Sequence, residues 1–328
     1  MLVRFHGVRG SCPAPASSDD LAARLVEAIW QLGHQKDTPD LTDRAAIARW
    51  VAGLPPAVGG TAGGNTACVE MRTAAGDLFI IDCGSGLRNL GNELMNSEFG
   101  QGQGHACIFL SHFHWDHIQG WPFFKPAYIS GNRLEVYTRH HHLESRLRQQ
   151  QKAPFFPPAS WDDMRADISF HEIDDKPLVL GKGRVRVTSL ELDHPSRAYA
   201  YRFEADGKVF VYASDGAYYK LDDVAIRPYV EFYRDADLLI FDAQFTLTES
   251  FDKHSWGHSS AIIGVELACQ ASVKKLVLFH HDPDADEATL EHLLRVGEEY
   301  AAIVPAAIRR SPDQVRLMLA REGMVIEL

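Results

Sequence analysis

The sequence lacks any apolar run near the roughly 18 residues that a membrane-spanning helix needs, so we expect no membrane-spanning segment. Its first ten residues contain no apolar core and no small-residue cleavage site, so we also expect no secretory signal. Cysteine is scarce and no Cys-x-x-Cys occurs, which argues against a disulfide framework and a zinc knuckle. We therefore expect reduced, mostly buried thiols in a cytoplasmic protein: Cys12, Cys68, Cys83, Cys107 and Cys269.

Basic residues are also few, because 33 Lys and Arg stand against 44 Asp and Glu, which gives a formal net charge of −11. An extended nucleic-acid surface must neutralise many phosphates with Lys and Arg, so the charge balance argues against one and leaves room only for a local basic pocket. The composition, 45% hydrophobic and 23% charged over 328 residues, is ordinary for a globular protein with a large core. We expect a single domain over residues 1–328.

Short apolar runs recur along the chain, and each ends on or just before an Asp or a His. Such runs are typical of buried strands. Several strands that end in this way predict sheets whose ends converge on one polar site. The runs and their polar residues are Leu78–Ile81 with Asp82, Ala106–Leu110 with His112, Val185–Leu192 with His194, Val209–Ala213 with Asp215, Leu238–Phe241 with Asp242, and Leu276–Phe279 with His280.

Turn and cap signals supply the remaining elements. Ala198–Glu204 and Lys208–Ala213 alternate polar and apolar residues around Asp206-Gly207, which predicts a β-hairpin. Apolar periodicity and N-cap residues predict helices over Ser259–Ala271 and Asp286–Tyr300. Strands interleaved with helices indicate a layered α/β architecture.

Two stretches look like additions to this core. Residues 19–53 carry two helical patterns separated by Thr38-Pro39, and we expect a helical insertion that is a lid, an oligomer face or a solvated decoration. Residues 122–163 are rich in Pro, Phe and His, and we expect them to form a cap. A homodimer through the insertion stays open at this point.

The segment Ser111–His117, SHFHWDH, is the strongest chemical signal in the sequence. It follows a predicted strand, and alternate residues of an extended segment point the same way, so His112 and His114 can share one metal ion. Asp116 and His117 lie where they can face a second ion. Imidazole suits zinc, and a carboxylate adds manganese or iron as alternatives. By contrast, His140–His142 follows no predicted strand, and we favour a solvated loop there.

SHFHWDH resembles the signature of the metallo-β-lactamase superfamily, whose members are αββα sandwiches with two mixed β-sheets flanked by helices. The family pattern continues with a lone His, an Asp and a final His after strands, and His194, Asp215 and His280 match it in order. The resemblance implies that two ions are bound, one by His112, His114 and His194, the other by Asp116, His117 and His280, with Asp215 bridging them. Asp82 matches an Asp that orients the ligand loop.

Further segments are similar to the phosphodiesterase branch of that superfamily, which includes ribonuclease Z and bacterial cyclic-nucleotide phosphodiesterases. They are VRFHGVRGS near the start, GGNT at Gly63–Thr66, DAQFT, and GHSS. The resemblance implies that His258 acts on the leaving group, supported by Asp242, and that Asp116 also belongs to the catalytic residues. FDAQ has Asp where the ribonuclease Z pattern has Glu, and we recognise no long arm rich in Gly and Pro that would hold tRNA.

The sequence therefore predicts a hydrolase with two divalent metal ions, zinc first, acting on a small nucleotide, cyclic ones included, or a related phosphodiester through a metal-bridging hydroxide. The alternatives are a glyoxalase II-like thioesterase, a tRNA 3′-end endonuclease of the ribonuclease Z type, and a non-catalytic binding member. Aromatic residues near the site, with Trp115 foremost, are candidates for stacking on a base. His281 is either a phosphate contact or a loop residue.

Overall fold

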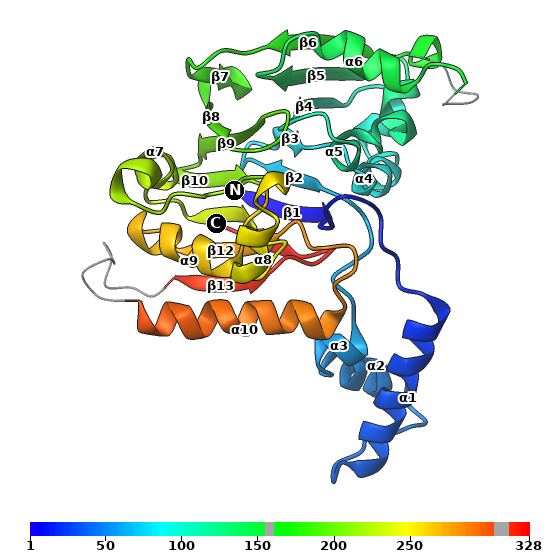
Figure 1. Ribbon diagram of the computed structural model, residues 1–328. Helices are drawn as coiled ribbons and strands as arrows, with labels where there is room; N and C mark the ends of the chain where they lie inside the picture. The colour runs from blue at the N-terminus through cyan, green and yellow to red at the C-terminus, as the bar shows by residue number, and fades with distance from the viewer. Residues whose placement is uncertain (155–160, 305–314) are drawn as a thin grey trace.

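The computed structural model describes residues 1–154, 161–304 and 315–328, in which two β-sheets pack face to face (Figure 1). Each sheet has seven strands. The first contains, in spatial order, β14 (Val325–Glu327), β1 (Leu2–Gly7), β2 (Cys68–Arg72), β3 (Leu78–Ile81), β4 (His105–Phe109), β5 (Arg133–Thr138) and β6 (Asp167–Glu172). The second contains β13 (Arg316–Leu319), β12 (Lys275–Phe279), β11 (Leu238–Asp242), β10 (Lys208–Ala213), β9 (Ala198–Ala205), β8 (Val185–Leu192) and β7 (Leu178–Leu180).

Both sheets are mixed. In the first, β1 to β3 pair antiparallel and β3 to β6 pair parallel. In the second, β7 to β10 pair antiparallel and β10 to β13 pair parallel. The parallel strands of each sheet direct their carboxyl ends to one edge, which is the edge where ligand sites form in such sheets.

Helices cover the outer faces of both sheets and form the insertion (Figure 1). The α-helices are α1 (Ser18–His34), α2 (Arg44–Ala52), α3 (Pro56–Gly59), α4 (Gly86–Leu94), α5 (Trp115–Ile118), α6 (Leu143–Gln150), α7 (Asp223–Tyr233), α8 (Leu247–Asp252), α9 (Ala261–Gln270) and α10 (Glu287–Ile303). Short 3-10 helices are η1 (Glu98–Gln101), η2 (Trp121–Phe123), η3 (Lys125–Tyr128), η4 (Trp161–Asp163), η5 (Gly181–Gly183) and η6 (His254–Trp256). The expected αββα sandwich is confirmed.

The alternation of apolar residues along the strands builds two hydrophobic cores. In β4, Cys107 and Phe109 face the second sheet, whereas Ala106 and Ile108 face α4 and α6 on the outside. The ring of Phe109 packs edge-on against that of Phe203 at a centroid distance of 5.2 Å, so aromatic contacts join the two sheets. Both faces of β4 are buried, so the strand has little freedom to move and fixes the start of the loop that follows it.

The predicted hairpin and capped helices are confirmed. Asp206 and Gly207 have φ of 56° and 68°, as a two-residue turn with both central residues left-handed requires. Ser260 caps α9, and Asp286 caps α10 with its side chain on the amide of Thr289. Both caps satisfy backbone donors that the first helical turn leaves unpaired.

The expectation of a cap over residues 122–163 needs correction. Its central part, Arg133–Thr138, is strand β5, which lies in the first sheet between β4 and β6. Leu134 and Val136 alternate with polar residues, as is typical of a strand. The Pro and Phe residues on either side instead favour an irregular segment. Helix α6 follows β5 and packs Leu143 and Leu147 on the outer core. The proline-rich residues 155–160 of this stretch lie outside the described residues.

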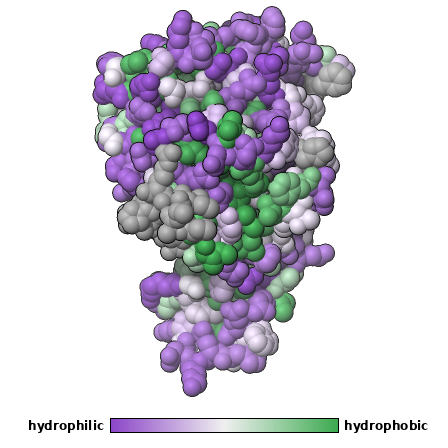
Figure 2. All heavy atoms as spheres, turned by 60° about the vertical axis from the view of Figure 1, so that its left-hand side comes forward, coloured by the Kyte–Doolittle hydropathy of each residue, from purple (hydrophilic) through white to green (hydrophobic). Residues whose placement is uncertain are grey.

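Residues 19–53 form α1 and α2, as predicted, and they project from the body of the sandwich together with α3 (Figure 1). On the face shown in Figure 2, hydrophilic side chains predominate and hydrophobic ones gather toward the middle. None of the helices in the described part of the chain combines the length and apolar character that crossing a bilayer requires. None of the five cysteines forms a disulfide bond, and only Cys12 is exposed.

Candidate metal centre

The polar residues that follow the strands meet at one edge of the sandwich. Asp82 follows β3, His112–His117 follow β4, His194 and Asp215 follow β8 and β10, and His280 follows β12. The structure brings all seven sequence-predicted ligands together in two adjacent groups. Their binding of metal remains a prediction.

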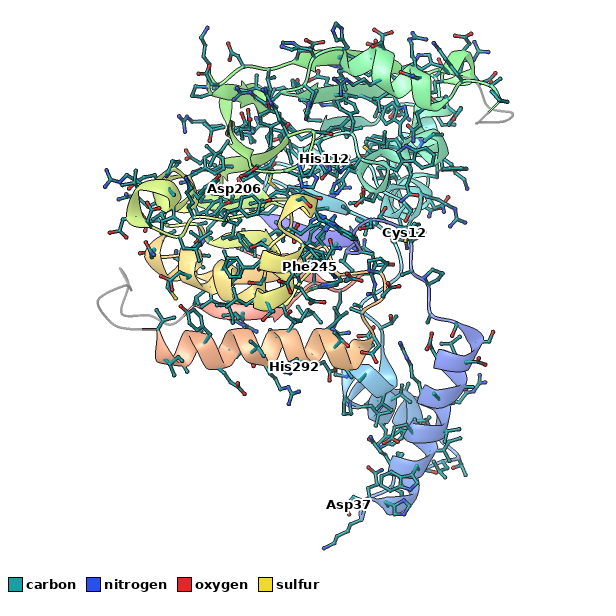
Figure 3. The ribbon with its side chains drawn as sticks, in the orientation of Figure 1. Cys12, Asp37, His112, Asp206, Phe245 and His292 are labelled. Atoms are coloured by element: carbon teal, nitrogen blue, oxygen red, sulfur yellow. The ribbon has the colours of Figure 1, made fainter. Side chains whose placement is uncertain are left out.

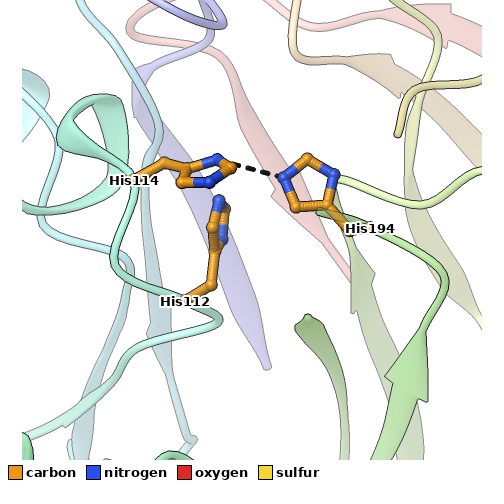
Figure 4. Close-up of side chains that lie close together, drawn as sticks. All are labelled: His112, His114 and His194. Atoms are coloured by element: carbon orange, nitrogen blue, oxygen red, sulfur yellow. Dashed lines mark hydrogen bonds between the residues drawn. The ribbon is translucent and has the colours of Figure 1, made fainter. Parts of the chain in front are cut away.

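The first group consists of His112, His114 and His194, whose ring nitrogens lie within 4.8 Å of one another (Figure 4). His114 Nδ1 and His194 Nε2 are 3.1 Å apart. His112 Nε2 is buried and has no hydrogen-bond partner in the structure. A buried nitrogen without a partner is costly, so its lone pair is free to bind a cation.

The second group consists of Asp116, His117, Asp215 and His280. His117 Nε2 lies 3.2 Å from His280 Nε2 and 3.1 Å from Asp215 Oδ2. His280 Nε2 lies 3.1 Å from Asp116 Oδ2. Asp215 Oδ1 is also 3.8 Å from His112 Nε2, so this carboxylate stands between the two groups. Its position suits the bridging role that the family resemblance implies.

Asp82 fixes the segment Ser111–His117, which we call the ligand loop, through its hydrogen bonds. Its Oδ2 accepts hydrogen bonds from His117 Nδ1, from the Ser111 hydroxyl and from the Tyr212 hydroxyl, each at 2.7 Å. Its Oδ1 accepts the Ser111 amide at 2.7 Å. His117 therefore presents Nε2 to the site, as a ligand histidine requires.

The other ligand histidines of the strand ends are oriented in the same way, through the nitrogen that faces away from the site. The contacts are His112 Nδ1 to Ser111 Oγ at 3.0 Å, His194 Nδ1 to Gly257 O at 2.9 Å, and His280 Nδ1 to Gln244 Oε1 at 2.9 Å. With Nδ1 donating, each Nε2 faces the site, where it can bind a cation in its unprotonated form. The donor set thus fits divalent cations of the zinc, manganese and iron type.

Some residues that shape the site were not singled out from the sequence. The Ser11 amide donates to Asp116 Oδ2 at 2.8 Å. A Cβ on Gly10 would lie 2.3 Å from the His280 ring, and one on Gly257 would lie 2.3 Å from His194 Nδ1. The segments GVRGS, DAQFT and GHSS were recognised as similar to family motifs, but spacing alone did not assign these contacts.

The histidines of the two groups differ in the direction in which their pKa values are shifted. Burial lowers the pKa of His194 to about 4 and that of His112 well below its usual range. Burial also opposes charge on His280 and His117, but the carboxylate of Asp215 and its acidic neighbours outweigh it, so the pKa of His280 is raised to about 9 and that of His117 rises as well. The first group is therefore a set of neutral nitrogens, whereas the second gathers positive charge.

His258 and Asp242 form a pair beside both groups. His258 Nδ1 lies 2.7 Å from Asp242 Oδ2 and 3.9 Å from Asp215 Oδ1. The ring of His258 stacks on that of His280 at a centroid distance of 4.9 Å. Asp242 Oδ2 also accepts the Asp215 amide at 3.1 Å. The pair is therefore fixed against the centre, and its catalytic role remains a prediction.

Comparison with known proteins agrees with this arrangement. A family model described as a β-lactamase superfamily domain matches residues 78–281, which contain all the predicted ligands. The chain belongs to the metallo-β-lactamase superfamily. It is 24% identical over 272 residues to ribonuclease BN of Shigella boydii serotype 18, a match that covers 70% of this chain and 85% of that protein. The match to ribonuclease BN of Escherichia coli O1:K1 is 25% identical over 281 residues, with the same coverage.

Three solved structures share the fold. The metallo-β-lactamase fold protein YhfI from Bacillus subtilis aligns with a TM-score of 0.61 and 18% identity, covering 99% of this chain and 98% of that one. A diphosphatase of the PhnP family aligns with a TM-score of 0.58 and 17% identity over 100% and 97% of the two chains. The short form of human tRNase Z aligns with a TM-score of 0.58 and 17% identity over 100% and 99%.

Two clefts lie beside the site, one along the ligand loop and one at His194. One, of about 690 Å³, is mostly apolar and includes Phe113, Trp115 and Phe123. The other, of about 650 Å³, is lined in part by His194 and by three arginines, Arg139, Arg146 and Arg197. Sequence reasoning found no cluster of arginines, because the three come from separate segments of the chain.

The aromatic residues and His281, which the sequence offered as substrate contacts, differ in their exposure. Trp115 is 79% exposed beside the apolar cleft, so it remains a candidate for stacking on a base. Trp121, Phe124 and Tyr218 are buried in the core, Phe123 and Tyr219 are partly exposed, and Phe155 and Phe156 lie outside the described residues. His281 is buried and donates from Nε2 to the Ala320 carbonyl at 2.9 Å, which is a structural role in the loop.

The solvated loop expected at His140–His142 needs a partial correction. His141 and His142 are exposed, as expected. His140 is 91% buried and packs edge-on against Phe113 and Tyr199 at centroid distances of 5.4 Å and 5.1 Å. The triplet has a buried member because the turn after β5 directs one ring inward.

We expect protein purified without chelator to hold two divalent ions per chain in elemental analysis, since two ligand groups share Asp215. Asp215→Ala should lose more metal than the control His142→Ala, because Asp215 faces both groups and His142 is exposed. A metal content near zero, with no activity restored by zinc, manganese or iron, would contradict the assignment.

Proposed function

We propose that this superfamily member is a metal-dependent phosphodiesterase that hydrolyses a small phosphodiester, such as a nucleotide diester. The observation that carries the proposal is the His258–Asp242 pair, which lies against the ligand groups while all seven predicted ligand positions are filled without it. A phosphodiester needs a proton donor for its departing alkoxide, and His258 is placed to supply one. The relatives named as ribonucleases and as a diphosphatase support the same class of reaction.

The side chains of the site have different roles in the proposed hydrolysis. When bound, divalent ions supply Lewis-acid stabilisation of charge on the phosphate and lower the pKa of the attacking water. Asp242 accepts a hydrogen bond from the Nδ1–H of His258, so Nε2 carries the proton that goes to the leaving group. Asp116 is held by Ser11 and His280, and its own part in catalysis remains a prediction.

A small substrate is favoured over a large nucleic acid by the net charge of −11. The free cysteines support a cytoplasmic location. A tRNA 3′-end endonuclease of the ribonuclease Z type is the second candidate, because the sequence matches to ribonuclease BN cover 70% of the chain. A thioesterase or a non-catalytic binding member has less support, since the His258–Asp242 pair would then have no role.

Purified protein should hydrolyse bis(p-nitrophenyl) phosphate or a cyclic nucleotide well ahead of the monoester p-nitrophenyl phosphate, because the ligand groups and the His258–Asp242 pair include no arginine to neutralise a phosphate dianion. A panel that also contains a thioester and a precursor tRNA tests the alternatives in one assay. Turnover of the thioester without any diester activity would refute the proposal, and turnover of the precursor tRNA alone would favour the second candidate.

Replacing His258 isolates the proton transfer. We expect His258→Ala to keep the fold and both metals, and to slow hydrolysis of a diester with an alkoxide leaving group by roughly 10²–10⁴. The loss should shrink for a p-nitrophenolate leaving group, which departs without protonation, and Asp242→Asn should show the same dependence at smaller size. His142→Ala, at an exposed histidine outside the clefts beside the site, serves as the control. Equal slowing of all leaving groups, or loss of metal, would assign His258 a ligand or structural role.

A further inference from the structure

The basic cleft beside His194 joins three parts of the chain. Arg139 follows β5, Arg146 lies on α6, and Arg197 lies in the loop that connects His194 to β9. The Arg139 guanidinium lies 5.2 Å from the centre of the Tyr199 ring, and that of Arg146 lies 5.0 Å from the centre of the Phe113 ring. These rings hold the guanidinium groups in place while their N–H donors stay available.

The charges in this cleft are only partly compensated. Asp174 and Glu191 also line it, and Arg197 Nε lies 3.5 Å from Glu191 Oε1, with both side chains exposed. Within the described residues, neither Arg139 nor Arg146 has a carboxylate partner within 4 Å; Arg139 bonds only to the Ser189 hydroxyl at 3.3 Å. Planar guanidinium donors without a carboxylate partner are suited to bind phosphate.

We propose that this cleft binds a second phosphate group of the substrate, apart from the phosphodiester that is cleaved. The inference rests on the proposed function, and it names the substrate class as a diester with a further phosphate on one arm. His194 belongs both to the first ligand group and to the wall of the cleft, so the second phosphate lies beside the reacting one.

Dinucleotides test this directly, because ApA, pApA and ApAp share one diester and differ only in a terminal phosphate. We expect one phosphorylated form to have a KM lower than that of ApA by about tenfold or more. Arg139→Gln and Arg146→Gln should remove that difference and leave hydrolysis of ApA and of bis(p-nitrophenyl) phosphate unchanged. The matched control is Arg148→Gln on the same helix, where the side chain pairs with Glu144 outside the cleft.

The outcomes separate the cleft from the proposed function. Equal KM values for the three dinucleotides, or a preference that the arginine variants keep, would overturn the cleft proposal while diester hydrolysis stands. If no diester is hydrolysed, the proposed function fails, and binding of pyrophosphate measured by calorimetry still tests the cleft. Pyrophosphate binding that is unaffected by Arg139→Gln and Arg146→Gln would then overturn it.

A second, independent observation concerns α1, which turns its apolar side to solvent. Leu21, Leu25 and Ile29 recur at every fourth position, with Val26 and Trp30 beside them, so they form one broad face. Each of the five side chains is more than half exposed, from 53% for Leu21 to 68% for Ile29. We call this surface the α1 face. No residue of α1 is buried.

The partly buried side of α1 carries Arg24, Ala28, Gln31 and Leu32, so the α1 face is not the side that packs on the body. Arg24 donates to the Gly60 carbonyl and lies 4.0 Å from Glu287 at the start of α10. An amphipathic helix normally packs its apolar stripe on its own protein and exposes its polar side. The reverse arrangement, on an insertion whose tip at Asp37 projects away from the body that holds His112 (Figure 3), leaves the α1 face for another molecule.

We propose that the α1 face binds the α1 face of a second copy of this chain, because an apolar face can pair with its own copy around a two-fold axis. Five side chains per copy offer on the order of 1,000 Å² of total buried area, near the lower limit for a specific interface.

Sedimentation of the full chain over about 1 to 200 µM should show a monomer–dimer equilibrium. Leu25→Glu and Ile29→Glu should abolish the dimer, whereas Val224→Glu, at a 78% exposed position on α7, should not. A monomer at every concentration, a dimer that survives Leu25→Glu, or binding of the monomer to lipid vesicles through this face would overturn the proposal.

Discussion

The carboxylate of Asp82 is the contact on which the centre depends. It is fully buried and accepts hydrogen bonds from the ligand His117, from the amide and hydroxyl of Ser111, and from Tyr212. Ser111 belongs to the loop after β4 in the first sheet, and Tyr212 belongs to β10 in the second. An unpaired buried carboxylate would be strongly unfavourable, so the two sheets are stabilised in the one relative position that satisfies it. That position also brings the ligands of the two sheets together.

The same backbone conformation recurs where the chain leaves the strands. Asp82, Asp215 and His280 have φ of 61°, 61° and 60°, in the left-handed region that non-glycine residues rarely adopt. Each such residue costs about 1–2 kcal/mol, and such conformations persist where the surroundings determine them fully. The reversal turns the side chain away from the direction of the strand and into the site. Hydrogen bonds to Ser111, Asp242 and Gln244 offset this strain.

The sequence was most informative where a ligand follows its own strand, because the apolar run and the polar residue after it are adjacent in the chain. His112, His194 and His280 could be placed in this way. It was least informative for contacts that arrive from elsewhere, such as the Ser11 amide on Asp116, since spacing says nothing of which segments meet in space. Strand β5 was missed for a related reason, because its flanks resemble an irregular cap more than its own six residues resemble a strand.

The electrostatic potential at the site depends more on where the charges lie than on the net charge of −11. Four carboxylates, those of Asp82, Asp116, Asp215 and Asp242, are at least 95% buried at the centre and face histidines. Two divalent ions would carry as much positive charge as these four groups carry negative charge, so a loaded centre presents little net repulsion to a phosphate. The electrostatic potential in the cleft at His194 then depends on three arginines, Arg139, Arg146 and Arg197. An acidic protein is in this way compatible with a small anionic substrate and unfavourable for a long one.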